Sequence, residues 1–389
     1  MRALEGITVV ALEHAVAAPF ATRHLADLGA RVIKVERPGE GDFARRYDAR
    51  VHGLSSHFVW TNRGKESVAL DLKSGPSREA LARLLSRADV FVQNLGPGAS
   101  ARLGLDHATL ASAHPRLVVC DISGYGDTGP YRDRKAYDLL VQAEAGLLSV
   151  TGMPEAPCKA GIAIADIAAG MYALCGILAA LHERARTGRG RRVEVSMLDA
   201  LAEWMGFPLY FGYDGAPPPP RTGAAHATLW PYGPYATADG ETLLFAVQQD
   251  AEWQRFCEVV VADAALARDP RGATAPLRDA HRAALDAIVR PRLAALPAAE
   301  LARRLDAAGL GFARVNDVAG LRAHPQLAAR QRWFEVGSEA GPIAALAAPL
   351  PAEPDRGARI PALGEHTRGV LSELGYDEAA IAAITGAAG

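Results

Sequence analysis

The sequence has few of the residues that would mark a secreted or a metal-binding protein. Its 389 residues include four cysteines, and no two of them form a CxxC pair: Cys120, Cys158, Cys175 and Cys257. Such scattered cysteines favour reduced thiols in a cytoplasmic protein and argue against a disulfide framework. They also argue against a cysteine-based metal site, so we expect no metal.

The chain also lacks an excess of charge of either sign. Lys and Arg number 42 against 44 Asp and Glu, a net charge of −2, so no global basic field points to nucleic acid. The N-terminal residues lack the apolar core of a signal peptide, and the longest apolar stretch, 167–181, falls short of a membrane span. We therefore expect a cytoplasmic enzyme that does not bind membranes, with two or three domains.

The first half of the chain alternates short β-branched runs with helical stretches. Helices are expected at 19–28 and 77–86, and strands at 7–12, 31–36, 68–72, 90–94, 117–122 and 192–196. This alternation predicts an α/β fold with a parallel sheet, whose ligands bind beyond the carboxyl ends of the strands. The first strand–helix turn, 13–19, lacks the GxGxxG fingerprint of dinucleotide-binding folds. We therefore expect a Rossmann-like domain that does not use NAD.

The composition changes after residue 213. Residues 214–220 (DGAPPPP) cannot form a regular element and indicate a linker. A hairpin around 239–241 and Ala-rich helices follow. We expect a large Rossmann-like domain over 1–213, a linker and a smaller α+β domain over 214–325, and a C-terminal segment, 326–389, that returns to the large domain.

One carboxylate is isolated in an apolar stretch. Asp166, in GIAIADIAAGM (161–171), is the only charged residue between Lys159 and His182, and it precedes a long helix that ends at Gly188. The N–H groups and positive dipole end at a helix start would keep this carboxylate ionised and available as a nucleophile. The alternative interpretation is that Asp166 is the N-cap residue of the helix.

Other polar residues fall at the ends of expected strands or in basic loops. His14 follows the first strand, Lys65 lies in a polar loop before the third, and Asn94 opens an NLGPG turn with Arg102 one helical turn beyond. Strand-end and glycine-turn positions suit the binding of an anionic ligand. Each position also has a structural interpretation: a satisfied buried histidine, a solvated loop and a plain β–α turn.

Together and in this order, the motifs resemble the class III CoA-transferase family, which includes formyl-CoA transferase and the carnitine and bile-acid CoA-transferases. The resemblance is carried by LEGI from residue 4, LGARVIKVERP (28–38), NLGPG (94–98), YDLLVQA (137–143), DIAAGMYA (166–173) and LGEHT (363–367). It implies that Asp166 is a nucleophile that forms an aspartyl-CoA thioester, and that the protein is a homodimer of interlocked rings. It also implies a path for coenzyme A along His14, Arg37, Lys65, Asn94, Arg102 and Lys135.

Three positions depart from patterns found within that family. Val16 stands where some transferases carry a Gln near the acyl intermediate, and GAAHAT (223–228), with His226, replaces a run of glycines. The family's α-methylacyl-CoA racemases have a histidine where this chain has Tyr137, just before Asp138. A tyrosine with a pKa near ~10 is a poor base at neutral pH, which favours transfer. A racemase or epimerase, and a non-catalytic CoA-binding paralogue, are the alternatives.

The overall pattern is most similar to family members that pair succinyl-CoA with short dicarboxylates. Itaconate is the first acceptor we expect, followed by citramalate and mesaconate. A second carboxylate needs a cation, and the candidates are Arg45, Arg46, Arg221 and His226. The alternative role of these residues is ion pairing on the surface.

Overall fold

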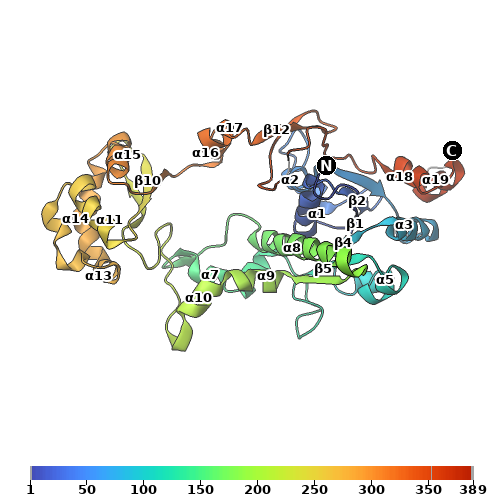
Figure 1. Cartoon of the computed structure of the whole chain (residues 1–389), viewed down its shortest axis with the longest axis horizontal. Coiled ribbons are helices and arrows are strands. Elements are labelled where there is room, and N and C mark those ends of the chain that lie inside the picture. The colour runs from blue at the N-terminus through green and yellow to red at the C-terminus, as the bar shows by residue number, and fades with distance from the viewer. Residues whose placement is uncertain (1, 352, 387–389) are drawn as a thin grey trace. The chain divides into compact units, whose positions relative to one another are not determined.

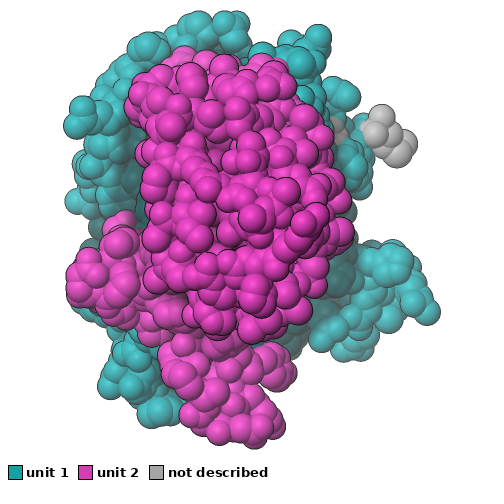
Figure 2. All heavy atoms as spheres, turned by 90° about the vertical axis from the view of Figure 1, so that its left-hand side faces the viewer, with its two compact units in different colours: residues 1–146, 160–206, 326–389 teal, residues 147–159, 207–325 magenta. Residues whose placement is uncertain are grey.

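The computed structural model describes residues 2–351 and 353–386, and the chain divides into two units, coloured separately in Figure 2. Unit 1 comprises 1–146, 160–206 and 326–389, and unit 2 comprises 147–159 and 207–325. Unit 2 thus contains 147–159, which the sequence assigned to the large domain. Gly223 donates its N–H to Gly152 O (2.8 Å), which ties this segment to the linker.

A six-stranded parallel sheet forms the centre of unit 1. Its order is β3-β2-β1-β4-β5-β8. The strands are β1 (Thr8–Leu12), β2 (Arg31–Glu36), β3 (Lys65–Ala69), β4 (Val90–Gln93), β5 (Val118–Ser123) and β8 (Arg192–Ser196). The strand order reverses between β1 and β4, as in doubly wound folds, whose ligands bind outside the carboxyl ends at this switch point.

The β-branched runs place five of the six strands within a residue or two of expectation. The exception is β3, which begins three residues earlier than predicted, at Lys65. Lys65 pairs with Val32 and Ser67 with Lys34 in the parallel register. The first residues of β3 are polar, so the sequence pattern did not predict a buried strand there. The side chains of Lys65 and Ser67 are nevertheless buried, because each has a polar partner inside the protein.

The long helix α8 (Ile164–Thr187) packs beside α1 (Ala17–Asp27), as Figure 1 shows. A Cβ on Gly170 would lie 2.7 Å from Ala17 O, so this approach requires glycine. With 24 residues, α8 is longer than the expected apolar stretch and could cross a membrane by length and composition. Its buried alanines belong to the largest hydrophobic cluster of unit 1, which explains its apolar sequence as that of a core helix.

The other helices of unit 1 surround the sheet. They are α2 (Ser56–Asn62), α3 (Gly75–Arg87), α4 (Ala99–Arg102), α5 (His107–Ala113), α6 (Asp138–Glu144), α9 (Met197–Trp204), α18 (Thr367–Glu373), α19 (Glu378–Thr385) and the 3₁₀ helix η1 (Phe43–Arg46). The C-terminal segment also forms a hairpin, β12 (Trp333–Val336) and β13 (Ile343–Leu346).

Unit 2 is an α+β structure with its own core. Its three-stranded antiparallel sheet has the order β11-β10-β9, with β9 (Tyr232–Ala236), β10 (Thr242–Ala246) and β11 (Phe312–Arg314). The expected hairpin joins β9 to β10. The helices that follow are α11 (Asp250–Arg255), α12 (Ala264–Ala267), α13 (Ala275–Ala280), α14 (Arg282–Ala294), α15 (Ala298–Ala307) and α16 (Val318–Arg322).

Candidate active site

Asp166 lies in the first turn of α8, beside the N-terminus of α1. The N-cap residue of α8 is Ala163, so the interpretation of Asp166 as the cap is wrong. The backbone N–H of Ala17, the first residue of α1, interacts with the Asp166 carboxylate and lowers its pKa. The N-termini of two helices therefore meet at this one side chain.

The environment of Asp166 favours its protonated form. Burial and then the negative charge of Asp138 raise the pKa of Asp166 to about 7, against a lowering by the Ala17 N–H. The expectation that helix N–H groups keep this carboxylate ionised is therefore wrong, because desolvation and the like charge outweigh them. A strongly perturbed pKa is typical of functional sites, and a poorly solvated carboxylate sheds little water when it attacks.

Asp138 fixes the backbone at Asp166. Its Oδ1 accepts the N–H of Ala165 at 2.8 Å and that of Asp166 at 3.3 Å. Its Oδ2 accepts from Gln142 Nε2 at 2.6 Å. Asp138 is the first residue of α6 but caps α8, a role that only the tertiary structure reveals.

His14 and Asn94 meet at the switch point between β1 and β4. Asn94 Oδ1 accepts the His14 N–H at 2.8 Å, and Asn94 Nδ2 donates to His14 O at 2.9 Å. The His14 ring stacks on Phe43 with centroids 5.4 Å apart. Burial lowers the pKa of His14, so its imidazole is neutral at pH 7. These two candidates lie together, as two strand ends on either side of a switch point should.

Lys65 does not fit the expected role of a phosphate ligand. It is 3% exposed, and its Nζ donates to Glu13 Oε1 (2.6 Å), Pro19 O (3.0 Å) and Asn62 Oδ1 (3.0 Å). Three partners occupy all its protons, and they include Glu13, the residue that directly follows β1.

The remaining cationic candidates are exposed. Arg37 follows β2 with a 74% exposed side chain that pairs with Glu40, while Arg102 ends α4 and Lys135 lies in the loop before α6. Sequence reasoning missed Lys73, which is exposed on the turn between β3 and α3. Its signal was present, because it is a basic residue just beyond the carboxyl end of a parallel strand.

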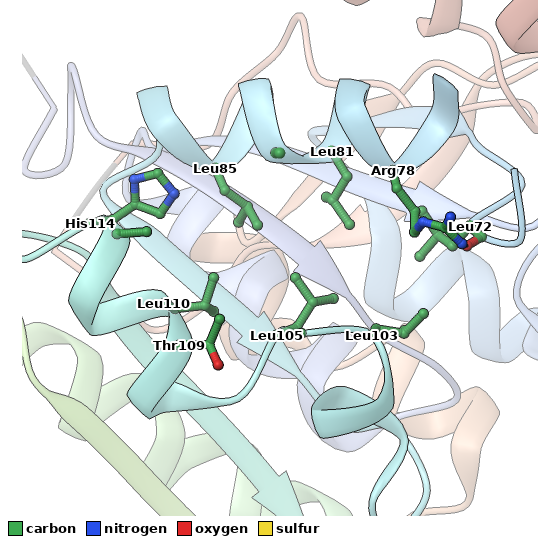
Figure 3. Close-up of a pocket in the computed structure, with 12 residues that line it drawn as sticks. Leu72, Arg78, Leu81, Leu85, Leu103, Leu105, Thr109, Leu110 and His114 are labelled. Atoms are coloured by element: carbon green, nitrogen blue, oxygen red, sulfur yellow. The ribbon is translucent and has the colours of Figure 1, made fainter. Parts of the chain in front are cut away.

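A cavity of about 220 Å³ lies between α3 and α5. Half of the residues that line it are leucines, and Figure 3 shows Leu72, Arg78 and Leu103 toward one end and His114 at the other. Leu72 immediately precedes Lys73, and Leu103 immediately follows Arg102. An apolar cavity beside exposed cations suits a ligand with a flat ring and phosphate groups.

The substrate-side candidates occupy different surroundings. Val16 is buried as the N-cap residue of α1, and Tyr137 is 64% exposed as that of α6. Tyr47, next to η1, is not one of the sequence candidates but interacts with Asp166; burial, Asp42 and Asp166 raise its pKa to about 12. His226, in unit 2, accepts the N–H groups of Thr228 and Leu229 at Nδ1 (both 3.1 Å), which gives it a loop-forming role.

The arginines offered for a second carboxylate have structural partners. Arg45 pairs with Glu36 through two nitrogens (2.7 and 2.9 Å) and lies 3.8 Å over the Phe58 ring. Arg46 donates to Glu40 O, and Arg221 donates to Met153 O and Pro154 O within unit 2. The alternative of ion pairing therefore fits Arg45, in a largely buried pair, whereas Arg46 and Arg221 donate to backbone carbonyls.

A carboxylate with a raised pKa, set beside a helix N-terminus of a doubly wound sheet without a dinucleotide fingerprint, is typical of an enzyme active site. The chain belongs to CoA-transferase family III, because residues 4–367 match the sequence model of that family. It is therefore an acyl-CoA:carboxylate CoA-transferase that acts on CoA thioesters.

Two relatives and one solved structure illustrate the similarity. The chain is 35% identical to "Succinate--glutarate CoA-transferase" of Agrobacterium fabrum, covering 95% of each chain. It is 32% identical to "Succinyl-CoA:mesaconate CoA-transferase" of Haloarcula marismortui, covering 97% of this chain and 98% of the relative. A CAIB/BAIF family protein from Brucella suis has the same fold, with a TM-score of 0.85, 33% identity, and coverage of 96% of this chain and 99% of that one.

Proposed function

We propose that this protein transfers coenzyme A from succinyl-CoA to a short dicarboxylate through an aspartyl-CoA thioester at Asp166. The observation that carries the proposal is the Asp166 carboxylate itself, poorly solvated in the first turn of α8, where the N–H of Ala17 at the start of α1 lowers its pKa. A nucleophile must be present as its anion, and a pKa of about 7 leaves about half of Asp166 ionised at neutral pH.

The transfer has four steps. Ionised Asp166 attacks the thioester carbonyl of the donor, which forms a mixed anhydride and releases CoA thiolate. The thiolate attacks the aspartyl carbonyl, which frees the donor acid and leaves the aspartyl-CoA thioester. The acceptor carboxylate attacks this thioester and again releases the thiolate. The thiolate then takes the acceptor acyl group from the second anhydride and regenerates the Asp166 carboxylate.

Each step places negative charge on a carbonyl oxygen next to Asp166. The first-turn N–H groups of α1 have no partner within that helix, and the N–H of Ala17 points at Asp166. Preorganised backbone donors of this kind stabilise a developing oxyanion and are worth about 10²–10³ in kcat. We propose that Val16, Ala17 and Ala18 supply them.

We propose that the coenzyme lies along the carboxyl edge of the sheet. Arg37, Lys73, Arg102 and Lys135 are the exposed cations there for its phosphates, and the α3–α5 cavity is a place for its adenine. His14 and Asn94 lie at the switch point, where the chain can approach the pantetheine arm. The homodimer and the cytoplasmic location stay predictions.

The acceptor proposal is supported by two relatives, a succinate–glutarate CoA-transferase and a succinyl-CoA:mesaconate CoA-transferase. A dicarboxylate whose second carboxylate meets a cation should exceed a monocarboxylate of similar length by about tenfold in kcat/KM. The test is a panel of itaconate, mesaconate, citramalate, glutarate and butyrate with succinyl-CoA as donor. Equal efficiency with butyrate would contradict the dicarboxylate proposal and leave the CoA-transferase assignment in place.

The thioester is tested by trapping. Incubation with succinyl-CoA alone, followed by hydroxylamine, should convert Asp166 to a hydroxamate that peptide mass spectrometry locates. Asp166→Ala should yield no adduct and lose at least about a thousandfold in kcat, because the nucleophile is gone. An active Asp166→Ala variant would refute the assignment. Uptake of solvent deuterium at the α-carbon of a 2-methylacyl-CoA would indicate the racemase instead.

A further inference from the structure

The turn between β1 and α1 contains a strained residue. Ala15 has a φ of 59°, in the left-handed region that residues with a Cβ rarely adopt. Such a conformation persists only where the surroundings determine it. The His14 backbone before it is held at both its N–H and its C=O by Asn94.

The group that holds Ala15 itself is Asp42. The Ala15 N–H donates to Asp42 Oδ1 at 3.1 Å, and the same oxygen accepts the Ala44 N–H at 2.9 Å. The other oxygen, Oδ2, accepts from Lys34 Nζ at 2.8 Å. Asp42 is 1% exposed, so these protein groups, and not water, fix its carboxylate.

The strained turn leads directly to the nucleophile. Two residues after Ala15, the Ala17 N–H interacts with the Asp166 carboxylate and lowers its pKa, and Ala17 lies where α1 meets α8. On the far side, α8 fixes Ala17 through the close approach at Gly170, where a Cβ would lie 2.7 Å from Ala17 O. The direction of the Ala17 N–H therefore depends on the backbone angles of Ala15.

We propose that Asp42 is a positioning residue of the transfer reaction. Its Oδ1 holds Ala15 in the left-handed conformation and thereby aims the Ala17 N–H at Asp166 and at the oxyanions formed there. The inference rests on the proposed role of Asp166 as the nucleophile. Asp42 reaches the reacting atoms only through the backbone between Ala15 and Ala17.

The first variant removes the acceptor. Asp42→Ala should lower kcat by about ten- to a hundredfold, because misplacing a catalytic donor by about 1 Å costs this much. It should also shift the acidic limb of the pH profile, the range in which kcat/KM rises as Asp166 ionises, to higher pH. The reason is that the Asp166 carboxylate loses the donor that lowers its pKa. The charged or titratable groups that interact with Asp166, Asp138 on α6 and Tyr47 after η1, are unchanged.

Rescue and a conservative variant separate positioning from stability. The double variant Asp42→Ala/Ala15→Gly should recover part of kcat, because glycine adopts φ of 59° without the hydrogen bond. Asp42→Asn keeps an acceptor for Ala15 but loses the ion pair with Lys34, so it should lose stability and keep the pH limb. If Asp42→Ala folds but keeps both kcat and the limb, Asp42 is only structural and the proposal is wrong.

A second variant acts from the other side and leaves the ion pairs in place, which covers the case in which Asp42→Ala does not fold. Ala15→Val should lower kcat and raise the limb, because a β-branched residue disfavours a positive φ. Ala262, with φ of 57° in unit 2, offers a matched control. Ala262→Val should lose similar stability without changing kcat or the limb. A folded Ala15→Val variant with wild-type kcat and limb would overturn the proposal.

Trapping separates this inference from the proposed function. A hydroxamate at a residue other than Asp166 would refute the nucleophile, whatever Asp42→Ala does. A hydroxamate at Asp166, together with an unchanged pH limb in Asp42→Ala and Ala15→Val, would refute only the positioning role.

Discussion

Unit 1 contains two sets of buried carboxylates that behave in opposite ways. Beneath the strand ends, Glu13, Glu36 and Asp42 interlock with Lys34, Lys65 and Arg45. Burial alone would raise the pKa of Glu36, but hydrogen bonds and charge from Arg45 and the charge of Lys34 lower it to about 2. Asp166 is also largely buried, yet its charged neighbour is Asp138, and its pKa rises to about 7.

The comparison shows that burial does not decide the state of a carboxylate by itself. In the network the cations lower the pKa values of all three acids against burial, while burial lowers the pKa of Lys65 to about 7. At Asp166 a like charge adds to desolvation, so the carboxyl holds its proton more strongly and loses it only near neutral pH. The ion-pair network stabilises the turn before α1. The pairing of Asp166 with Asp138 instead keeps a reactive carboxylate beside the N-terminus of α1.

Breaking the network should have the largest effect. Lys34→Met removes a fully buried cation and leaves Glu13 and Asp42 without their shared partner. We expect a loss of about 3–5 kcal/mol in the free energy of unfolding, measured by urea denaturation. Arg191→Met, which breaks an exposed pair with Glu183, is the control and should cost less than about 1 kcal/mol. Equal losses would mean that the network is not stabilising.

Removing the charge of Asp166 should stabilise the folded protein, whereas breaking the network should destabilise it. Its folded pKa of about 7 exceeds an unfolded value near ~3.9, so the folded state binds more protons between these pH values and wild-type stability falls as pH rises through them. Asp166→Asn has no such proton. Its stability advantage should be near zero at pH 4 and grow to about 1–3 kcal/mol at pH 8, a figure reduced for partial exposure. Thermal unfolding at both pH values measures this, and a destabilised variant at pH 8 would contradict it.

Changing the neighbour of Asp166 should have the smallest effect. In the wild type, kcat/KM should rise with pH to a limb near 7, since only ionised Asp166 reacts. Asp138→Asn keeps an oxygen for the Ala165 N–H but removes the like charge, so the limb should move down. Relative to its own plateau, activity at pH 6 should rise about two- to fivefold. A limb that stays near 7 would show that desolvation alone sets the pKa.

Much of the fold was predictable from the sequence. The β-branched runs gave β1, β2, β4, β5 and β8, because a strand buried on both faces must be apolar. Gly188 ends α8 with a φ of 72°, as its place after the last apolar turn predicted. Asp166 was recognisable because it is the only charged residue in an apolar stretch, where burying a carboxylate is costly.

The sequence did not predict which polar residues lie at the surface. In the sequence Lys65 looks like part of a basic loop. In the structure its side chain is buried and forms an ion pair with Glu13, 52 positions earlier. Arg45 looks free, but it pairs with Glu36 and stacks on Phe58. Lys73 drew no notice, although it is the exposed cation on that turn. Ion-pair partners distant in sequence leave no local pattern, so these roles could not be read from the chain.

The amino-acid sequence by itself determined the alternation of strands and helices, the likeness to CoA-transferases and the identity of the isolated carboxylate. These follow from local patterns of apolar, glycine and charged residues. Only the tertiary structure decided that Asp138 caps α8, that Asp42 holds Ala15, and that Asp166 titrates near 7. The pKa of a carboxylate depends on its solvation and on charges brought near it by folding, and neither exists in the unfolded chain.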